Sequence, residues 1–150
     1  MGIGDPLVFA VVFAALYAAH EVGDHWVQTH HQACGKDARD RRGRLLCGLH
    51  VASLTATKAV ALLLVVVVTG VHLAPWAVGV GLAVDAASHY WADRRFTLQA
   101  LAARVGKGGF AQLGDPAAAP VGVGSYALDQ SWHVGWLFIA ALILSIGGAA

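Results

Sequence analysis

Long apolar runs separated by polar stretches divide the chain into four segments. The predicted helices cover residues 6–28, 45–74, 76–95 and 126–147. The second segment is the clearest, because a helix over it would measure about 45 Å and would cross a hydrocarbon core of about 30 Å. The third is marginal, since its apolar part gives only about 24 Å and residues 92–95 must extend it. The pattern predicts an all-α integral membrane bundle of four transmembrane helices in a single domain, residues 1–150.

Composition supports a bilayer as the surroundings of this chain. Hydrophobic residues make up 57% of it and charged residues only 13%, whereas soluble domains contain about 25% charged residues. We expect no cleaved signal peptide, because residues 1–6 carry no lysine or arginine. The two cysteines lie in a region predicted below to face the reducing cytoplasm, so we expect free thiols.

The basic residues predict the orientation. Apart from Lys58, all lysines and arginines lie between the first and second segments, or from the end of the third segment to the start of the fourth: Lys36, Arg39, Arg41, Arg42, Arg44, Arg94, Arg95, Arg104 and Lys107. By the positive-inside rule both long loops are cytoplasmic and both termini lie outside, in a multi-pass plasma-membrane protein. Topology accounts for these charges, so we expect no nucleic-acid partner. A short interfacial helix is expected at 97–105 and a flexible loop at 105–124.

Ionisable side chains inside the apolar segments are the main functional signal. Depths calculated from the cytoplasmic helix ends place them in one layer near that membrane face. Such groups cost several kcal/mol each at membrane depth unless they are paired, protonated or bound to metal. They are His20, Glu21, Asp24, His50, Asp85, His89, Asp93, Asp129 and His133.

Their spacing favours a metal site. Histidine and aspartate four residues apart share one helix face, and several helices repeat this spacing at one depth. Helical bundles build di-metal sites from inward histidines and carboxylates in this way. The predicted metal ligands are His20, Asp24, His50, His89, Asp93, Asp129 and His133. Imidazoles with carboxylates favour zinc, with manganese or iron as alternatives, and Glu21 or Asp85 is the expected general base.

The same residues carry a family resemblance. His-x-x-Gly-Asp-x-x-x-Gln at residues 20–28, His50, His-x-x-x-Asp at 89–93 and Asp-Gln-x-x-His at 129–133 resemble a family of small bacterial four-helix membrane proteins, a domain of unknown function. The resemblance spans nearly the whole chain. It implies location in the bacterial inner membrane and marks these residues as the site, but it implies no activity. Glu21 and Asp85 fall outside the family pattern.

Two further features allow more than one interpretation. Lys58 lies near the bilayer centre, where it either extends outward to the interface or pairs with a carboxylate, and the second interpretation is favoured. His30, Cys34, Cys47 and His50 form an H-x3-C…C-x2-H pattern that suits zinc, but the intervening residues are highly charged and His50 has a competing role.

Three classes of function fit this polar layer. The favoured one is a metal-dependent membrane enzyme, a hydrolase of a lipid-like or membrane-embedded substrate, in which divalent ions activate water. The second is a proton or metal-ion transporter, although the outer half of the membrane offers only Thr69 and His72 beyond Lys58. The third is an accessory protein whose polar core only fixes helix packing. The bilayer is the expected partner, and an oligomer is compatible with the sequence.

Overall fold

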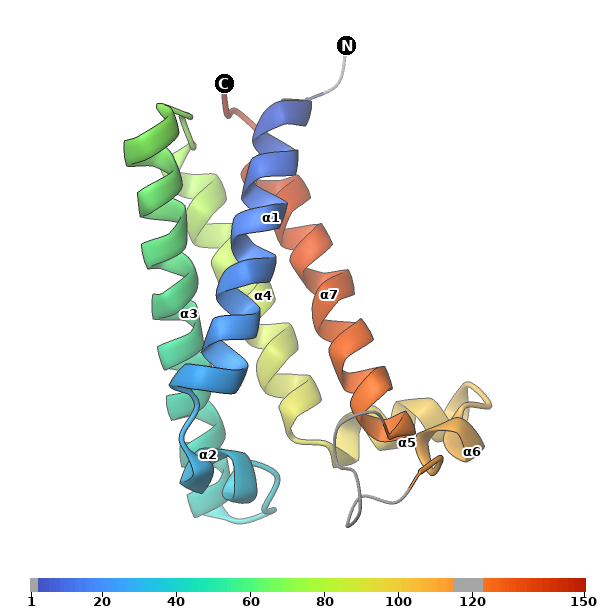
Figure 1. Cartoon of the computed structure of the whole chain (residues 1–150). Coiled ribbons are helices and arrows are strands. Elements are labelled where there is room, and N and C mark those ends of the chain that lie inside the picture. The colour runs from blue at the N-terminus through green and yellow to red at the C-terminus, as the bar shows by residue number, and fades with distance from the viewer. Residues whose placement is uncertain (1–2, 115–122) are drawn as a thin grey trace.

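The computed structural model describes residues 3–114 and 123–150, and the secondary structure of these residues is helical apart from two isolated β-bridges. The helices are α1 (Pro6–Val22), the π-helical turn η1 (Gly23–Val27), α2 (His30–Gly35), α3 (Arg41–Thr69), α4 (Pro75–Asp93), α5 (Phe96–Arg104), α6 (Gly108–Ala111) and α7 (Gly124–Leu144). Figure 1 shows the long helices α1, α3, α4 and α7 side by side, with α2, α5 and α6 at the end far from both termini. The all-α prediction is confirmed.

Capping residues set the helix starts that sequence reasoning placed only approximately. The Asp5 carboxylate accepts bonds from the Leu7 and Val8 amides at 2.8 and 3.0 Å, which fixes the start of α1 before Pro6. Asp40 accepts a bond of 2.7 Å from the Gly43 amide at the start of α3. The second long helix therefore begins at Arg41 rather than at 45.

The helix ends also differ from the sequence prediction. Helix α3 ends at Thr69, and not at 74, because Gly70 adopts a left-handed conformation with φ of 75°. Helices α4 and α7 end within a few residues of the expected positions. The interfacial helix expected at 97–105 is present as α5. In the stretch expected as a loop, 108–111 form the short helix α6, and 115–122 lie outside the described residues.

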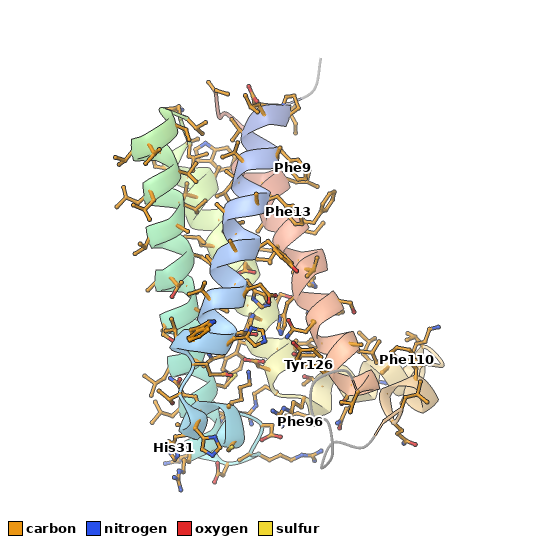
Figure 2. All side chains as sticks on the ribbon, in the orientation of Figure 1. Phe9, Phe13, His31, Phe96, Phe110 and Tyr126 are labelled. Atoms are coloured by element: carbon orange, nitrogen blue, oxygen red, sulfur yellow. The ribbon has the colours of Figure 1, made fainter. Side chains whose placement is uncertain are left out.

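The four long helices pack in a closed ring. Helix α1 contacts α3 and α7, and α4 contacts the same two helices from the opposite side. The apolar core lies at the end of this ring that carries the termini, where it includes Val8, Val12, Leu16, Leu62 and Leu137. Figure 2 shows Phe9 and Phe13 toward that end and Phe96 and Tyr126 toward the other end. Polar and apolar parts of the interior therefore occupy opposite ends of the bundle.

Among the residues that the structure describes, three helical stretches are long and apolar enough to cross a membrane: Pro6–Val27, Arg41–Thr69 and Gly124–Leu144. Helix α4 is not among them, because Asp85, His89 and Asp93 reduce its mean hydropathy. The outward faces of these stretches carry large apolar side chains, such as Val67 and Val68, which are 71% and 78% exposed. Such a surface is typical of contact with lipid.

Candidate metal centre

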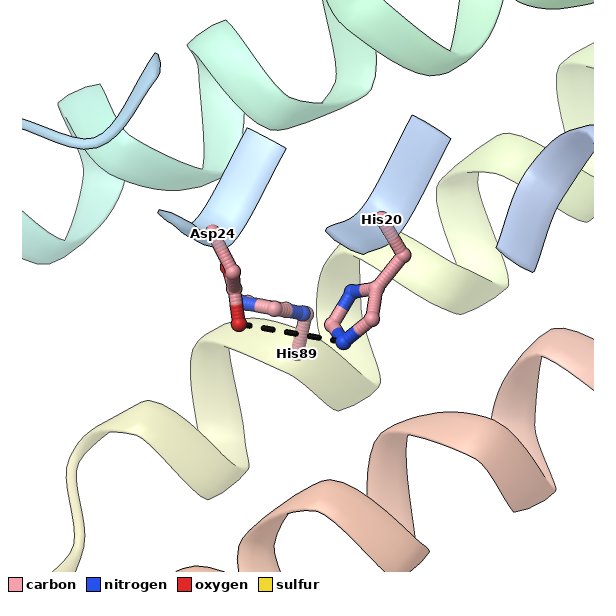
Figure 3. A group of neighbouring side chains, drawn as sticks. All are labelled: His20, Asp24 and His89. Carbon is pink, nitrogen blue, oxygen red and sulfur yellow. Dashed lines mark ion pairs between the residues drawn. The ribbon is translucent and has the colours of Figure 1, made fainter. Parts of the chain in front are cut away.

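The first pair of polar residues lies at the C-terminal end of α1 and in the turn η1 that follows it. His20 is fully buried on α1, and its Nε2 lies 3.7 Å from the Asp24 carboxylate (Figure 3). Asp24 belongs to the π-helical turn, in which the Gln28 amide donates to the Gly23 carbonyl over 2.9 Å. A π turn inserts one extra residue into a helix and changes the direction of the following side chains, and such turns are frequent at functional sites. The turn therefore determines where the Asp24 side chain points.

Helices α3 and α4 contribute the centre of the cluster. The Nε2 atoms of His50 and His89 face each other across 3.1 Å. One oxygen of Asp93 lies 3.2 Å from each of these nitrogens, and one oxygen of Asp24 lies 3.1 Å from His50 and 3.6 Å from His89. Two imidazoles and two carboxylates from three helical segments thus converge on one small volume.

Helix α7 completes the cluster. His133 Nε2 lies 3.5 Å from Asp129 and 3.9 Å from Asp93. Its ring is stacked on that of His89 with centroids 3.9 Å apart. The Asp129 side chain retains 25% of its exposure, whereas that of His133 is almost completely buried. Asp129 therefore lies on the side of the cluster that is nearest to solvent.

The donor atoms have the spacing of metal ligands. Within the described part of the chain they form three overlapping groups, each with donor atoms within 4.8 Å of one another: His20, Asp24 and His89; His50, His89 and Asp93; Asp93, Asp129 and His133. Ligands bound tetrahedrally at about 2.0–2.1 Å lie about 3.3–3.4 Å apart, close to the observed separations of 3.1 to 3.6 Å around His50 and His89. Each ligand predicted from the sequence therefore belongs to one of these groups, which are joined through the shared residues His89 and Asp93.

Charge in the cluster also fits a cation. The buried Lys36 ammonium lies 2.7 Å from the Asp93 carboxylate. With neutral histidines, three carboxylates (Asp24, Asp93 and Asp129) against this one ammonium leave two negative charges, which a divalent cation would balance. This role of Lys36 was not predicted, because its position in the sequence indicates only the orientation of the chain.

Several buried polar atoms of the cluster lack a hydrogen-bond partner among the described residues. They include both ring nitrogens of His20, Nε2 of His133 and the Nδ1 atoms of His50 and His89. Because most buried polar atoms in folded proteins do have partners, several orphaned donors and acceptors in one small volume indicate a place for an ion or water. A cluster that served only as hydrogen-bonded packing would be expected to satisfy these atoms internally.

The two residues predicted as general bases lie elsewhere. Asp85 forms an ion pair of 2.5 Å with the fully buried Lys58, which agrees with the interpretation that Lys58 pairs with a carboxylate. Glu21 has a side chain that is 43% exposed and lies 3.7 Å from His25. Neither residue belongs to the three donor groups, so their placement gives the predicted catalytic role no support.

The four residues of the H-x3-C…C-x2-H pattern do not lie close together either. Cys34 is exposed and contacts His30 at 3.5 Å, while Cys47 is buried with its thiol directed at the Tyr90 carbonyl oxygen. His50 points into the cluster instead. These residues form no shared metal site in the part of the chain that the structure describes.

No model of a known protein family matches the chain, and neither does any curated protein or solved structure. The resemblance to the bacterial membrane family therefore depends on the motif residues alone. The same residues form the cluster.

Proposed function

We propose that the chain is a four-span protein of the bacterial inner membrane, with the cluster near the cytoplasmic face and both termini outside. The ring of long helices supports a membrane crossing for α4, because a neighbour on each side crosses with it. Its 19 residues would measure about 28 Å, close to the hydrocarbon thickness. The loop lysines and arginines supply the orientation. The sequence motifs support membership of the family of unknown function that it resembles.

The proposed activity is that of a metal-dependent membrane enzyme, a hydrolase whose substrate is lipid-like or embedded in the membrane. The observation that carries it is the convergence of four histidines and three aspartates with donor atoms at ligand spacing. A divalent ion at such a site lowers the pKa of bound water and so supplies a nucleophile at neutral pH. Mixed imidazole and carboxylate donors favour zinc, with manganese or iron as alternatives.

The proposed role of each cluster residue depends on how deeply its side chain is buried. His20, Asp24, His50, His89, Asp93 and His133 are the proposed holding groups, because they are buried or nearly buried on α1, η1, α3, α4 and α7. Lys36 orients Asp93 through its contact with one carboxylate oxygen. Asp129 is the carboxylate nearest to solvent, and it is placed to accept a proton from water as general base. This assignment replaces Glu21 and Asp85 in that role.

Transport is the alternative that the buried Lys58–Asp85 pair favours, since it extends the polar interior one helical turn beyond His89. Above this pair, however, the interior is filled by the apolar core that includes Leu16, Leu62 and Leu137. Polar side chains line ion and proton pathways in membranes. The apolar core therefore favours a site open to one side over a path through the bundle.

Metal content tests the proposal. Protein purified in detergent without chelator should contain a stoichiometric divalent ion by elemental analysis. Asp24→Asn and His133→Ala should lower this content sharply, because each removes a ligand, while the exposed His72→Ala should leave it unchanged. Wild-type protein free of stoichiometric metal, or site variants with full metal content, would reject the metalloenzyme.

A further inference from the structure

A cleft of about 470 Å³ opens beside the cluster. It lies between the connection from α2 to α3, the start of α5 and the first turns of α7. Asp129 lines this cleft and also contacts His133, so the cleft leads directly to the candidate metal centre. Figure 2 shows Phe96 and Tyr126, two of its aromatic lining residues, at the same end of the bundle.

Guanidinium groups dominate the charge of the cleft. Arg39, Arg94 and Arg95 all line it. Arg95 pairs with Asp37 at 3.2 Å, whereas Arg39 and Arg94 have no carboxylate partner within the described part of the chain. Two guanidinium charges in the cleft are therefore not neutralised by a carboxylate of the described residues.

The guanidinium groups of Arg39 and Arg94 are both held near one aromatic ring. The central carbon of Arg39 lies 4.7 Å from the centre of the Phe96 ring, and that of Arg94 lies 5.5 Å from it. Arg94 is only 5% exposed and donates to the carbonyl oxygens of Lys36 and Ala38 at 3.0 and 2.5 Å. This arrangement keeps the Arg94 charge in place before any ligand arrives. Arg94 therefore contributes a fixed positive charge, and the exposed Arg39 is the planar guanidinium group that can offer paired contacts to phosphate oxygens.

An apolar groove of about 270 Å³ continues from the charged cleft between α5 and α7. The two share Leu98, Ala102 and Leu128 as lining residues, and Trp132 lines the groove farther along. A ligand that occupies both must therefore join an anionic group to an apolar chain.

We propose that this composite site binds an anionic lipid by its phosphate headgroup, with the start of an acyl or isoprenoid chain in the groove. A free phosphate would use only the arginines, so the adjoining groove favours the lipid. The inference deepens the proposed function, on which it rests, because it names a phosphate-bearing lipid as the substrate class delivered to the metal centre through the Asp129 side of the cluster.

Binding can be measured independently of catalysis. The protein is held in phosphatidylcholine nanodiscs and titrated separately with dioctanoyl phosphatidic acid, dioctanoylglycerol and inorganic phosphate, with calorimetry and tryptophan fluorescence as readouts. Only the phosphatidic acid should bind saturably. Arg39→Ala should weaken it by about tenfold, because one charge-assisted contact is lost, and Arg39→Lys should weaken it less. Arg104→Ala removes an exposed arginine of α5 that does not line the site, and it should change the affinity by less than about twofold.

The possible outcomes separate this inference from the proposed function. If inorganic phosphate bound as tightly as the phosphatidic acid, the site would be one for a soluble anion. If dioctanoylglycerol bound as tightly as the phosphatidic acid, the arginines would not contribute to binding. Either result overturns the inference, as would unaltered binding to Arg39→Ala. Arg39→Ala should retain the metal content of the wild type. Stoichiometric metal without lipid binding would therefore defeat only this inference, whereas lipid binding without metal would defeat only the metalloenzyme.

Discussion

Replacing one member of the Lys58–Asp85 pair should destabilise the protein strongly, whereas replacing both should not. The Lys58 side chain is completely buried and that of Asp85 is 4% exposed, with 2.5 Å between nitrogen and oxygen. Two unit charges at 2.5 Å attract by about 7 kcal/mol at an effective dielectric constant of about 20. The cost of removing both charges from water offsets much of this attraction.

Lys58→Met leaves a buried carboxylate without its partner, so we expect a loss of about 3–5 kcal/mol in the free energy of unfolding. Asp85→Leu should cost a similar amount, since it leaves a buried ammonium. The double variant contains neither charge and should lie within about 1–2 kcal/mol of the wild type, because apolar replacements of buried ion pairs are often neutral.

Reversible unfolding in mixed micelles, followed by circular dichroism as the fraction of denaturing detergent rises, measures these differences. Lys107→Met is the matched control, because Lys107 is exposed in the loop after α5 and should be nearly neutral. A double variant as unstable as the sum of the two single variants would show no coupling and would refute the reasoning.

Two further predictions concern topology and the π-helical turn. A membrane-impermeant maleimide should label the exposed Cys34 only from the cytoplasmic side and the buried Cys47 from neither side. A reporter fused after Ala150 should be active on the outer side. Labelling of Cys34 from outside would contradict the proposed orientation. In Gly23→Ala the new methyl group would overlap the Leu54 side chain, so we expect a loss of about 1–3 kcal/mol in stability and a lower metal content. Unchanged unfolding and metal content would contradict this account of the turn.

Periodicity was sufficient to predict the all-α class and the residues that gather in the cluster. The i, i+4 spacing placed His89 with Asp93 and Asp129 with His133, and the structure brings both pairs together. Helical phase also explains why Glu21 lies apart, because it follows the inward His20 by one residue and so points about 100° away from it.

Other features depend on contacts that one sequence does not contain. The π-helical turn places Gly23 against the Leu54 side chain, and regular helical spacing in the sequence gives no sign of the turn. The Lys36 ammonium reaches Asp93 from a separate short helix and loop, and its position in sequence indicates only a cytoplasmic charge. Asp85 shares a helix face with His89, but the neighbouring Lys58 on α3 decides its role.

The metal-binding groups come from helices that emerge from the ribosome one after another. In the proposed topology His20 and Asp24 would enter the membrane before Asp129 and His133, which belong to α7. Until α7 is inserted, the earlier carboxylates would lack part of the proposed coordination and would have to be protonated or solvated, which costs several kcal/mol in lipid. Insertion of α7 and capture of the proposed ion would thus be thermodynamically linked. Metal starvation during biogenesis would then lead to incompletely assembled chains that membrane proteases can degrade.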